Sequence, residues 1–192
     1  MLTTLVSNYN GERKNGKKHG KGKYTFPCGD VYNGNWVKGK KHGKGKYVFA
    51  TGESYDGDWE NDDMNGKGKY IFENGDIYEG DWVDGVIQGK GTYYYETGDK
   101  YIGQFQNSAR HGEGKFIYKN GNIYIGSFKD DLFHGKGKYH FVSGSVYEGQ
   151  YKNDKRHGKG KYVSANGSTK YEGYFKYGKY CGTIRNNIYT CQ

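Results

Sequence analysis

A strict period of 23 residues is the feature that most constrains this sequence. A tyrosine followed two residues later by a glycine recurs at this spacing from Tyr9, and a last copy follows a one-residue insertion at Tyr171. The copies begin at residues 9, 32, 55, 78, 101, 124, 147 and 171, and the eighth is truncated. Self-similarity of this kind is typical of repeat proteins, in which each unit packs only against its neighbours. The sequence predicts an N-terminal cap at 1–8, a repeat array at 9–182 and a C-terminal tail or cap at 183–192.

Each copy predicts one β-hairpin. Rings and glycines alternate with polar residues over five to seven positions, which indicates strands, and no segment has the 3.6-residue period of a helix. In the second copy we expect strands at about 32–37 and 42–49, with the turn at Gly39. The link to the next copy contains Gly52, for which we expect a positive φ. The predicted fold class is all-β: an elongated, twisted, single-layer antiparallel sheet of stacked hairpins, roughly 75 Å long at about 4.8 Å per strand.

The expected hairpin register pairs Val37 with His42. One face then carries Tyr32 opposite Tyr47, Gly34 opposite Gly45 and Trp36 opposite Gly43, so that rings lie on bare backbone. On the other face, acidic residues oppose lysines, in the pairs Asp58–Lys67, Asp56–Lys69, Asp81–Lys90 and Glu148–Lys161.

Composition agrees with a core made of rings. Only 33% of the residues are hydrophobic, whereas 18% are aromatic and 34 are glycine. The sequence shows neither a signal peptide nor a run of about 18 apolar residues, which predicts an intracellular protein. Cys28, Cys181 and Cys191 lack paired spacing, so we expect free thiols.

The recurring histidines, lysines and glycines do not predict chemistry. His19, His42, His111, His134 and His157 fall in register, at about 9 to 10 Å from one hairpin to the next, which is too far apart to share one metal ion. No copy has the spacing of a phosphate-binding loop. A catalytic site needs a set of groups that occurs once in the chain. Nearly every acidic residue and histidine here instead recurs at the same position of successive copies. We therefore expect no enzyme activity, no cofactor, no metal and no small-molecule substrate.

In these motifs the chain resembles MORN-repeat proteins (membrane occupation and recognition nexus), whose repeat reads Y-x-G-x-W, then H-G-x-G-x-Y, then a glycine link. The resemblance covers residues 9–182 and departs from the pattern at Arg13, Asn65 and Gln88. It implies a non-catalytic module, of the kind found in axonemal radial spoke heads, protist cytoskeletal scaffolds, junctional membrane tethers and appendages on enzymes. A chain made of repeats alone is most like the spoke-head or scaffold members, in the cytoskeleton or in the axoneme of a cilium or flagellum.

Two functions of different classes follow: a scaffold that binds other proteins, with a second copy of the chain as one candidate, and a peripheral membrane module that binds acidic phospholipids. The formal net charge is +9, but it is uneven: residues 1–54 carry 11 basic and 3 acidic groups, residues 55–100 carry 4 and 12, and residues 101–192 carry 15 and 6. A surface that follows a membrane or a nucleic acid would stay basic along its length. The acidic middle favours protein partners and argues against nucleic acid.

The face of the predicted sheet that carries the aromatic rings has two candidate roles, which are compatible with each other. Stacked repeats would bury the rings, and a groove lined by the same rings would bind an extended or helical peptide. The predicted partner-binding aromatic face consists of Tyr32, Trp36, Tyr47, Tyr55, Trp59, Tyr70, Tyr78, Trp82, Tyr93, Tyr101, Phe105 and Phe116.

Overall fold

A computed structural model describes residues 8–183 and residue 191, and those residues form strands, turns and links without a helix. The chain divides into two compact units, residues 1–96 and 97–192. The first unit contains β1 (Asn8–Lys14), β2 (Lys17–Thr25), β3 (Val31–Val37), β4 (Lys40–Val48), β5 (Ser54–Glu60), β6 (Asp63–Ile71), β7 (Ile77–Val83) and β8 (Val86–Tyr94). The second contains β9 (Lys100–Gln106), β10 (Ala109–Ile117), β11 (Ile123–Lys129), β12 (Leu132–His140), β13 (Val146–Lys152), β14 (Lys155–Val163), β15 (Thr169–Lys176) and β16 (Lys179–Tyr180).

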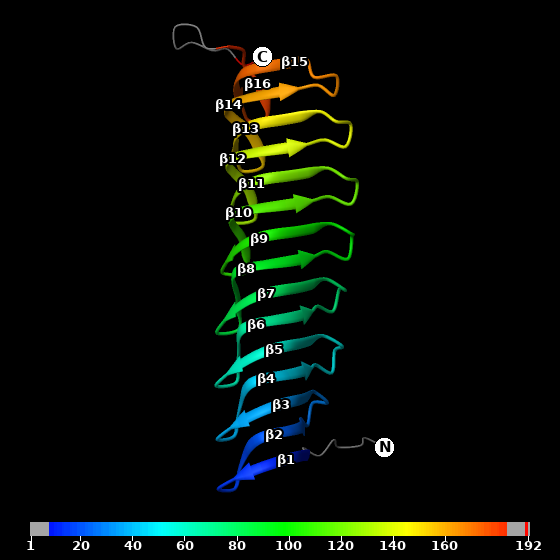
Figure 1. Cartoon of the computed structure of the whole chain (residues 1–192), viewed down its shortest axis with the longest axis vertical. Coiled ribbons are helices and arrows are strands. Elements are labelled where there is room, and N and C mark those ends of the chain that lie inside the picture. The colour runs from blue at the N-terminus through cyan, green and yellow to red at the C-terminus, as the bar shows by residue number, and fades with distance from the viewer. Residues whose placement is uncertain (1–7, 184–190, 192) are drawn as a thin grey trace. The chain divides into compact units, whose positions relative to one another are not determined.

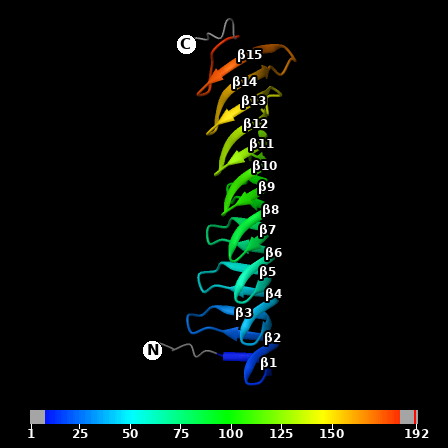
Figure 2. The same ribbon diagram turned by 90° about the vertical axis from the view of Figure 1, so that its left-hand side faces the viewer.

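Within each unit the strands form one antiparallel layer in chain order, and consecutive hairpins lie side by side (Figure 1). Figure 2 shows the edges of these stacked hairpins. The predicted all-β class of stacked hairpin repeats is confirmed, while the predicted length of the array stays a prediction. Of the two expected caps, only Asn8, Thr183 and Cys191 fall among the described residues.

The hairpin turns have two residues, and both of them have positive φ. In the second hairpin these are Lys38 at 52° and Gly39 at 93°, and in the third Asn61 at 54° and Asp62 at 86°. Two successive positive φ angles are typical of type I′ turns, which match the twist of the strands they join. The predicted turn at Gly39 is confirmed, as is the positive φ of the link glycine Gly52, at 101°.

The predicted register is right at the link end of the hairpin and wrong at the turn end. Tyr32 pairs with Tyr47 and Gly34 with Gly45, as expected, but Val37 pairs with Lys40 and Trp36 with Lys41, not with His42 and Gly43. Because the turn is so short, β4 begins two residues earlier than expected. Three residues of β4, 42–44, therefore oppose the single residue 35 of β3 and form a bulge, in which Gly43 has a φ of 62°.

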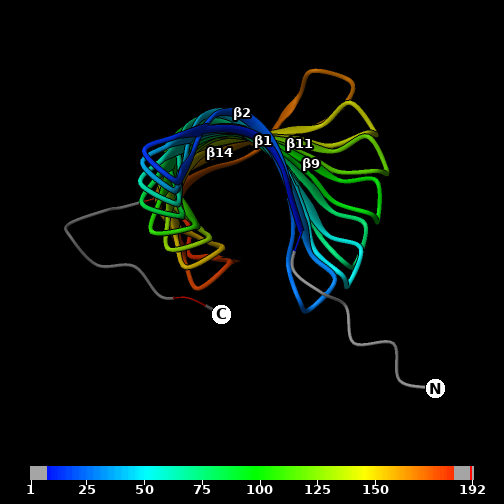
Figure 3. The same cartoon turned by 90° about the horizontal axis from the view of Figure 1, so that it is seen from below.

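Each hairpin bends sharply at this bulge. The Tyr32 hydroxyl donates to the carbonyl oxygen of Asn35, 3.0 Å away and three residues ahead on the same strand. A straight strand would place that residue about 10 Å along the chain, so the strand must fold over toward the side that carries the ring. Figure 3 shows that the strands of each unit are curved rather than straight. We call the concave side, with the rings, the ring face, and the other side the outer face.

Ion pairs on the outer face connect neighbouring hairpins. Lys44 lies 2.7 Å from Asp58 and Lys138 lies 2.8 Å from Glu148, and in both cases the partner belongs to the next hairpin. The predicted oppositions within a hairpin hold for Asp56–Lys69 and Glu148–Lys161. They are wrong for Asp58–Lys67 and Asp81–Lys90, because the bulge intervenes. There the carboxylates of Asp58 and Asp81 instead accept the backbone N–H groups of Lys67 (3.0 Å) and Lys90 (2.8 Å).

Replacing Gly45 by alanine tests the contact between ring and glycine. A Cβ at this position would overlap the Tyr32 ring, and we expect Gly45→Ala to lower the free energy of unfolding by about 1 to 3 kcal/mol. The measurement is the midpoint and slope of urea unfolding. Gly16→Asn is the matched control, because Gly16 has a φ of 75° and open space around it, and asparagine tolerates that backbone. Equal losses for the two variants would contradict the packing argument.

Candidate functional site

The leading tyrosines form the centre of the ring face. Those that are fully buried, at 0% exposure, are Tyr32, Tyr55, Tyr78, Tyr101, Tyr124 and Tyr147. Tyr55 shows the arrangement: its ring lies 5.1 Å from Trp59 of its own hairpin and 5.3 Å from Trp82 of the next, both edge to face. This geometry is favoured between aromatic rings. A tyrosine is thus buried by two rings, one from each of two consecutive hairpins.

The tryptophans reach back to the preceding hairpin. The Trp59 indole N–H donates to the carbonyl oxygen of Gly45 at 2.9 Å, and Trp36 donates to Gly22 at the same distance. In the first described hairpin the equivalent position carries Arg13 in place of a ring. In the last described hairpin Tyr171 is 37% exposed, and its ring centre lies 4.9 Å from that of Tyr180.

The structure gathers the twelve predicted site residues on the ring faces of the two units, but most of them are core. Ten are buried: Tyr32, Trp36, Tyr47, Tyr55, Trp59, Tyr78, Trp82, Tyr101, Phe105 and Phe116. Only Tyr70 and Tyr93 are half-buried. A partner-binding role for the set stays a prediction, and the surface that a partner could reach lies mainly on other rings of the same face.

Those rings belong to the links and were missed from the sequence. In the first unit Phe49 lies 4.6 Å from Tyr47 and 6.1 Å from Tyr70, and Phe72 continues the zigzag at 4.6 Å from Tyr70 and 5.7 Å from Tyr93. We call this row the ring ladder; its first-unit members are Tyr24, Phe26, Tyr47, Phe49, Tyr70, Phe72, Tyr93 and Tyr95. A second row in the other unit consists of Phe116, Tyr118, Tyr139, Phe141 and Tyr162. The sequence signal was an aromatic residue two positions after the second-strand ring.

A second column on the ring face changes chemistry from hairpin to hairpin. It is the residue opposite the large ring of the first strand, or opposite Arg13 in the first hairpin. Its members are Lys18, Lys41, Met64 and Ile87 in the first unit, and Arg110, Phe133, Arg156 and Tyr180 in the second. The Lys41 ammonium lies 4.0 Å from the Trp59 ring centre and 4.7 Å from that of Tyr47. Burial lowers the pKa of Lys41, although Asp62 opposes the shift. In such cation–π contacts the aromatic rings attract the positive charge and partly offset the cost of removing it from water.

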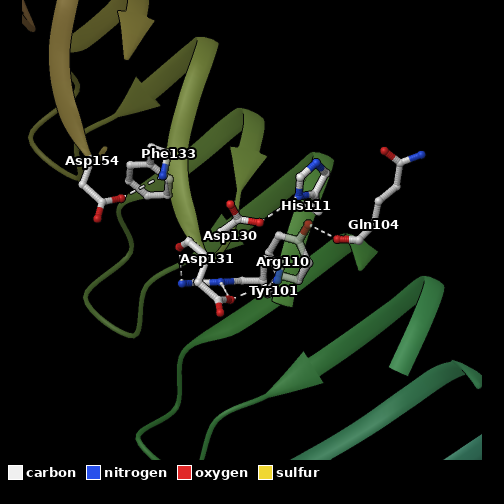
Figure 4. Close-up of polar contacts among 8 residues, drawn as sticks. All are labelled: Tyr101, Gln104, Arg110, His111, Asp130, Asp131, Phe133 and Asp154. Carbon is white, nitrogen blue, oxygen red and sulfur yellow. Dashed lines mark hydrogen bonds and ion pairs between the residues drawn. The ribbon is translucent and has the colours of Figure 1, made fainter. Parts of the chain in front are cut away.

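Polar contacts cross-link the turns of neighbouring hairpins. Arg110 donates from its backbone N–H to the Asp131 carboxylate at 2.9 Å and from its Nε at 3.0 Å, and Phe133 N–H donates to Asp154 at 2.8 Å (Figure 4). His111 Nδ1 lies 3.5 Å from Asp130 in the next turn. His111 thus lies beside the turn of the next hairpin. In the described part of the chain no three His, Cys, Asp or Glu side chains are grouped as a metal site would require.

Carboxylates cross-link the links of the first unit. Asp30 accepts the Tyr47 hydroxyl at 2.6 Å and the Ala50 N–H at 2.9 Å, and the bond from Tyr47 is the main reason that the pKa of Asp30 is lowered. Asp76 accepts Tyr93 and the Glu96 N–H, both at 2.8 Å. In the second unit, the links that follow the first one carry a neutral residue at the position equivalent to Asp30 and Asp76, beginning with Asn122.

The cysteines differ in part from the prediction. Cys181 and Cys191 are joined by a disulfide, so the expectation of free thiols is wrong for this pair. The two cysteines are ten residues apart in the sequence, a spacing that matches no known motif. Cys28 is a free, exposed thiol.

Alkaline pH tests the burial of the tyrosines. Burial, assisted by a hydrogen bond to Glu53, raises the pKa of Tyr70 to about 12 from its ordinary value of about 10. The folded state therefore holds this proton more tightly, and its stabilising effect is complete below pH 10 and lost as the pH rises toward 12. We expect the free energy of unfolding to fall across this range, and to fall less steeply in the Tyr70→Phe variant. The phenolate absorbance of Tyr70, taken as the difference between the unaltered chain and Tyr70→Phe, should appear together with unfolding. Phenolate formation by Tyr70 near pH 10 in the folded protein, in the same difference measurement, would contradict the prediction.

Comparison with solved structures identifies the same type of sheet elsewhere. The TCP domain of SAS-4 (dCPAP) from Drosophila melanogaster, in complex with a proline-rich motif of Ana2 (dSTIL), matches with 13% sequence identity and a TM-score of 0.52, over 80% of this chain and 84% of that chain. The TCP10 domain of Danio rerio CPAP, in complex with a STIL peptide, matches with 10% identity and a TM-score of 0.39, over 81% and 84%. At these identities the first match shows a similar fold only.

A comparison with curated proteins finds no match. In the part of the chain that the structure describes, no helix is long and apolar enough to span a membrane.

A comparison with protein families identifies the repeats themselves. The MORN repeat model matches eight consecutive segments, at residues 9–31, 32–54, 55–77, 78–100, 101–123, 124–146, 147–169 and 171–183. With its repeats matched over nearly the whole described chain, the protein belongs to the MORN repeat family.

Proposed function

We propose that this protein is a non-catalytic scaffold that positions other proteins in a cytoskeletal or ciliary assembly, such as a radial spoke head. MORN repeats fit a protein-interaction scaffold. The observation that carries the proposal is the ring ladder, a row of aromatic side chains that recurs in every full hairpin of the first unit and is half-buried except at the buried Tyr47. Aromatic residues supply much of the binding energy at protein interfaces. A row of equivalent rings is suited to holding a long partner.

The solved neighbour from Drosophila supports the scaffold part of the proposal. That domain was solved in complex with a proline-rich motif of another protein, and its fold resembles this one. A protein of similar fold thus binds a peptide segment of a partner. The cytoskeletal or ciliary setting rests on the resemblance to MORN proteins that consist of repeats alone.

The proposal includes no reaction. Acidic, histidine and tyrosine side chains recur from hairpin to hairpin, and those described above are engaged with turns, bulges and links. A catalytic centre would require groups that occur once and are held in a specific geometry.

A second candidate is a peripheral membrane module that binds acidic phospholipids. The observation that favours it is a set of exposed lysines in the first two hairpins: Lys14, Lys17, Lys21, Lys23, Lys40 and Lys46. On β5 to β7 the outer face is instead acidic at Asp56, Glu60 and Glu79. A lipid surface would attract the first two hairpins and repel the next.

Detergent extraction distinguishes the two candidates. In ciliated or flagellated cells the tagged chain should stay with the axonemal or cytoskeletal pellet. A Phe49→Ala, Phe72→Ala double variant should be released, because it removes two ladder rings. The matched control, Lys21→Ala with Lys23→Ala, should stay in the pellet, and circular dichroism checks that all variants fold. Release of the unaltered chain by detergent, together with flotation on acidic liposomes at physiological salt, would overturn the scaffold in favour of the membrane module.

A further inference from the structure

We propose that the ring ladder of the first unit binds an extended, proline-rich segment that carries basic residues. This inference rests on the proposed scaffold function and specifies its partner. It combines three observations: the spacing of the rings, their exposed surfaces, and a carboxylate-lined hollow beside them.

The spacing of the ladder selects the conformation of the partner. Equivalent rings, such as Tyr47 on β4 and Tyr70 on β6, are two strands apart, which is about 9.6 Å. A polyproline II helix repeats every three residues and about 9.3 Å, so it presents the same face to each hairpin. An α-helix repeats its face every seven residues, about 10.5 Å. Over the two intervals from Tyr47 to Tyr93 the mismatch is therefore about 0.6 Å for polyproline II and about 1.8 Å for a helix.

The rings of the ladder form pairs whose planes are tilted with respect to each other. Tyr47 and Phe49 lie 4.6 Å apart with their planes at 49°, and Tyr70 and Phe72 lie 4.6 Å apart at 47°. Neither pair is stacked face to face, and apart from Tyr47 these rings are half-buried. A proline ring is short, rigid and apolar, and proline-rich segments dock in aromatic-lined grooves of this kind. The tyrosine hydroxyls are already bonded to Asp30 and Glu53, which fixes the orientation of their rings.

Charge on the link side selects basic residues. A hollow of about 390 Å³ is lined by Glu53, Phe72, Glu73 and Asn74. Glu53 accepts the Tyr70 hydroxyl at 3.1 Å, whereas the exposed Glu73 carboxylate has no ion pair or hydrogen bond to the residues that the structure describes. A lysine or arginine side chain here would meet two carboxylates and the face or edge of an aromatic ring.

The second unit provides an internal contrast. Where the first unit has Glu73 and Glu96 directly after the link ring, the second has Lys119 and Val142. Its ladder has similar rings but lacks these carboxylates. The complementary charge therefore assigns the basic segment to the first unit. A residue pattern of two prolines and one cation, repeated every three residues, would place a cation at the link side of each hairpin.

Titration calorimetry with defined peptides on the full chain tests the proposal. A peptide of four Pro-Pro-Lys units should bind with one copy per chain and weaken as salt is added. A peptide of four Pro-Pro-Glu units should not bind, and one of four Gly-Ser-Lys units, which keeps the charge but not the conformation, should bind at least tenfold more weakly. Equal binding of the two lysine peptides would overturn the conformational argument, and binding of the glutamate peptide would overturn the charge argument.

Variants locate the site. Glu53→Gln with Glu73→Gln should weaken the Pro-Pro-Lys peptide by about threefold to tenfold, as expected for two exposed ion pairs. Glu79→Gln is the matched control, because Glu79 pairs with Lys69 on the outer face at 2.9 Å, and it should bind as the unaltered chain does. Unchanged binding by the double variant would overturn the site. If the chain stays in the cytoskeletal pellet but binds no proline-rich peptide, the scaffold function stands and this inference fails.

Discussion

The rest of the structure depends on one contact, the phenol ring of a leading tyrosine on a pair of glycines. Gly34 and Gly45 face each other across the second hairpin, and a side chain on either would collide with Tyr32. The absence of side chains lets the ring lie on the backbone and lets its hydroxyl reach the carbonyl of Asn35. That bond requires the strand to bend, and the bulge opposite supplies the extra residues. A single layer thereby acquires a concave face, which is what allows a sheet without a second layer to bury its rings.

Burial then couples each hairpin to its neighbours. A leading tyrosine is closed by the large ring of its own hairpin and by the ring of the next, so no single hairpin completes its own core. The coupling constrains the tyrosines, glycines and large rings, but it leaves the column of Lys18, Lys41, Met64 and Ile87 able to vary. The link rings and their neighbouring carboxylates vary as well. The chain can therefore change its binding surface from hairpin to hairpin while the core contact is repeated without change.

The period and alternation of the sequence were sufficient to predict the fold, because both report the core directly. The register was predicted correctly where glycine faces glycine, and failed beyond Gly34 because a two-residue turn and a bulge compensate for each other in length. Predicting the ring face as a partner site did not account for burial: Tyr55 and Trp59 are core, while Phe49 and Phe72 carry the accessible surface. Their signal was present in the aromatic residue after each second strand. The disulfide between Cys181 and Cys191 could not be predicted, because two cysteines ten residues apart without a motif do not specify a pairing.

Hydrogen–deuterium exchange on a Trp59→Ala variant tests most directly whether a large ring belongs to the preceding hairpin as much as to its own. Trp59 covers Tyr32 at 5.3 Å and donates to Gly45, both in the second hairpin. The account predicts that amides of β3 and β4 lose protection together with those of β5 and β6, while β1 and β2 stay protected. Loss of protection confined to β5 and β6 would contradict it, since the ring would then stabilise only the hairpin that carries it.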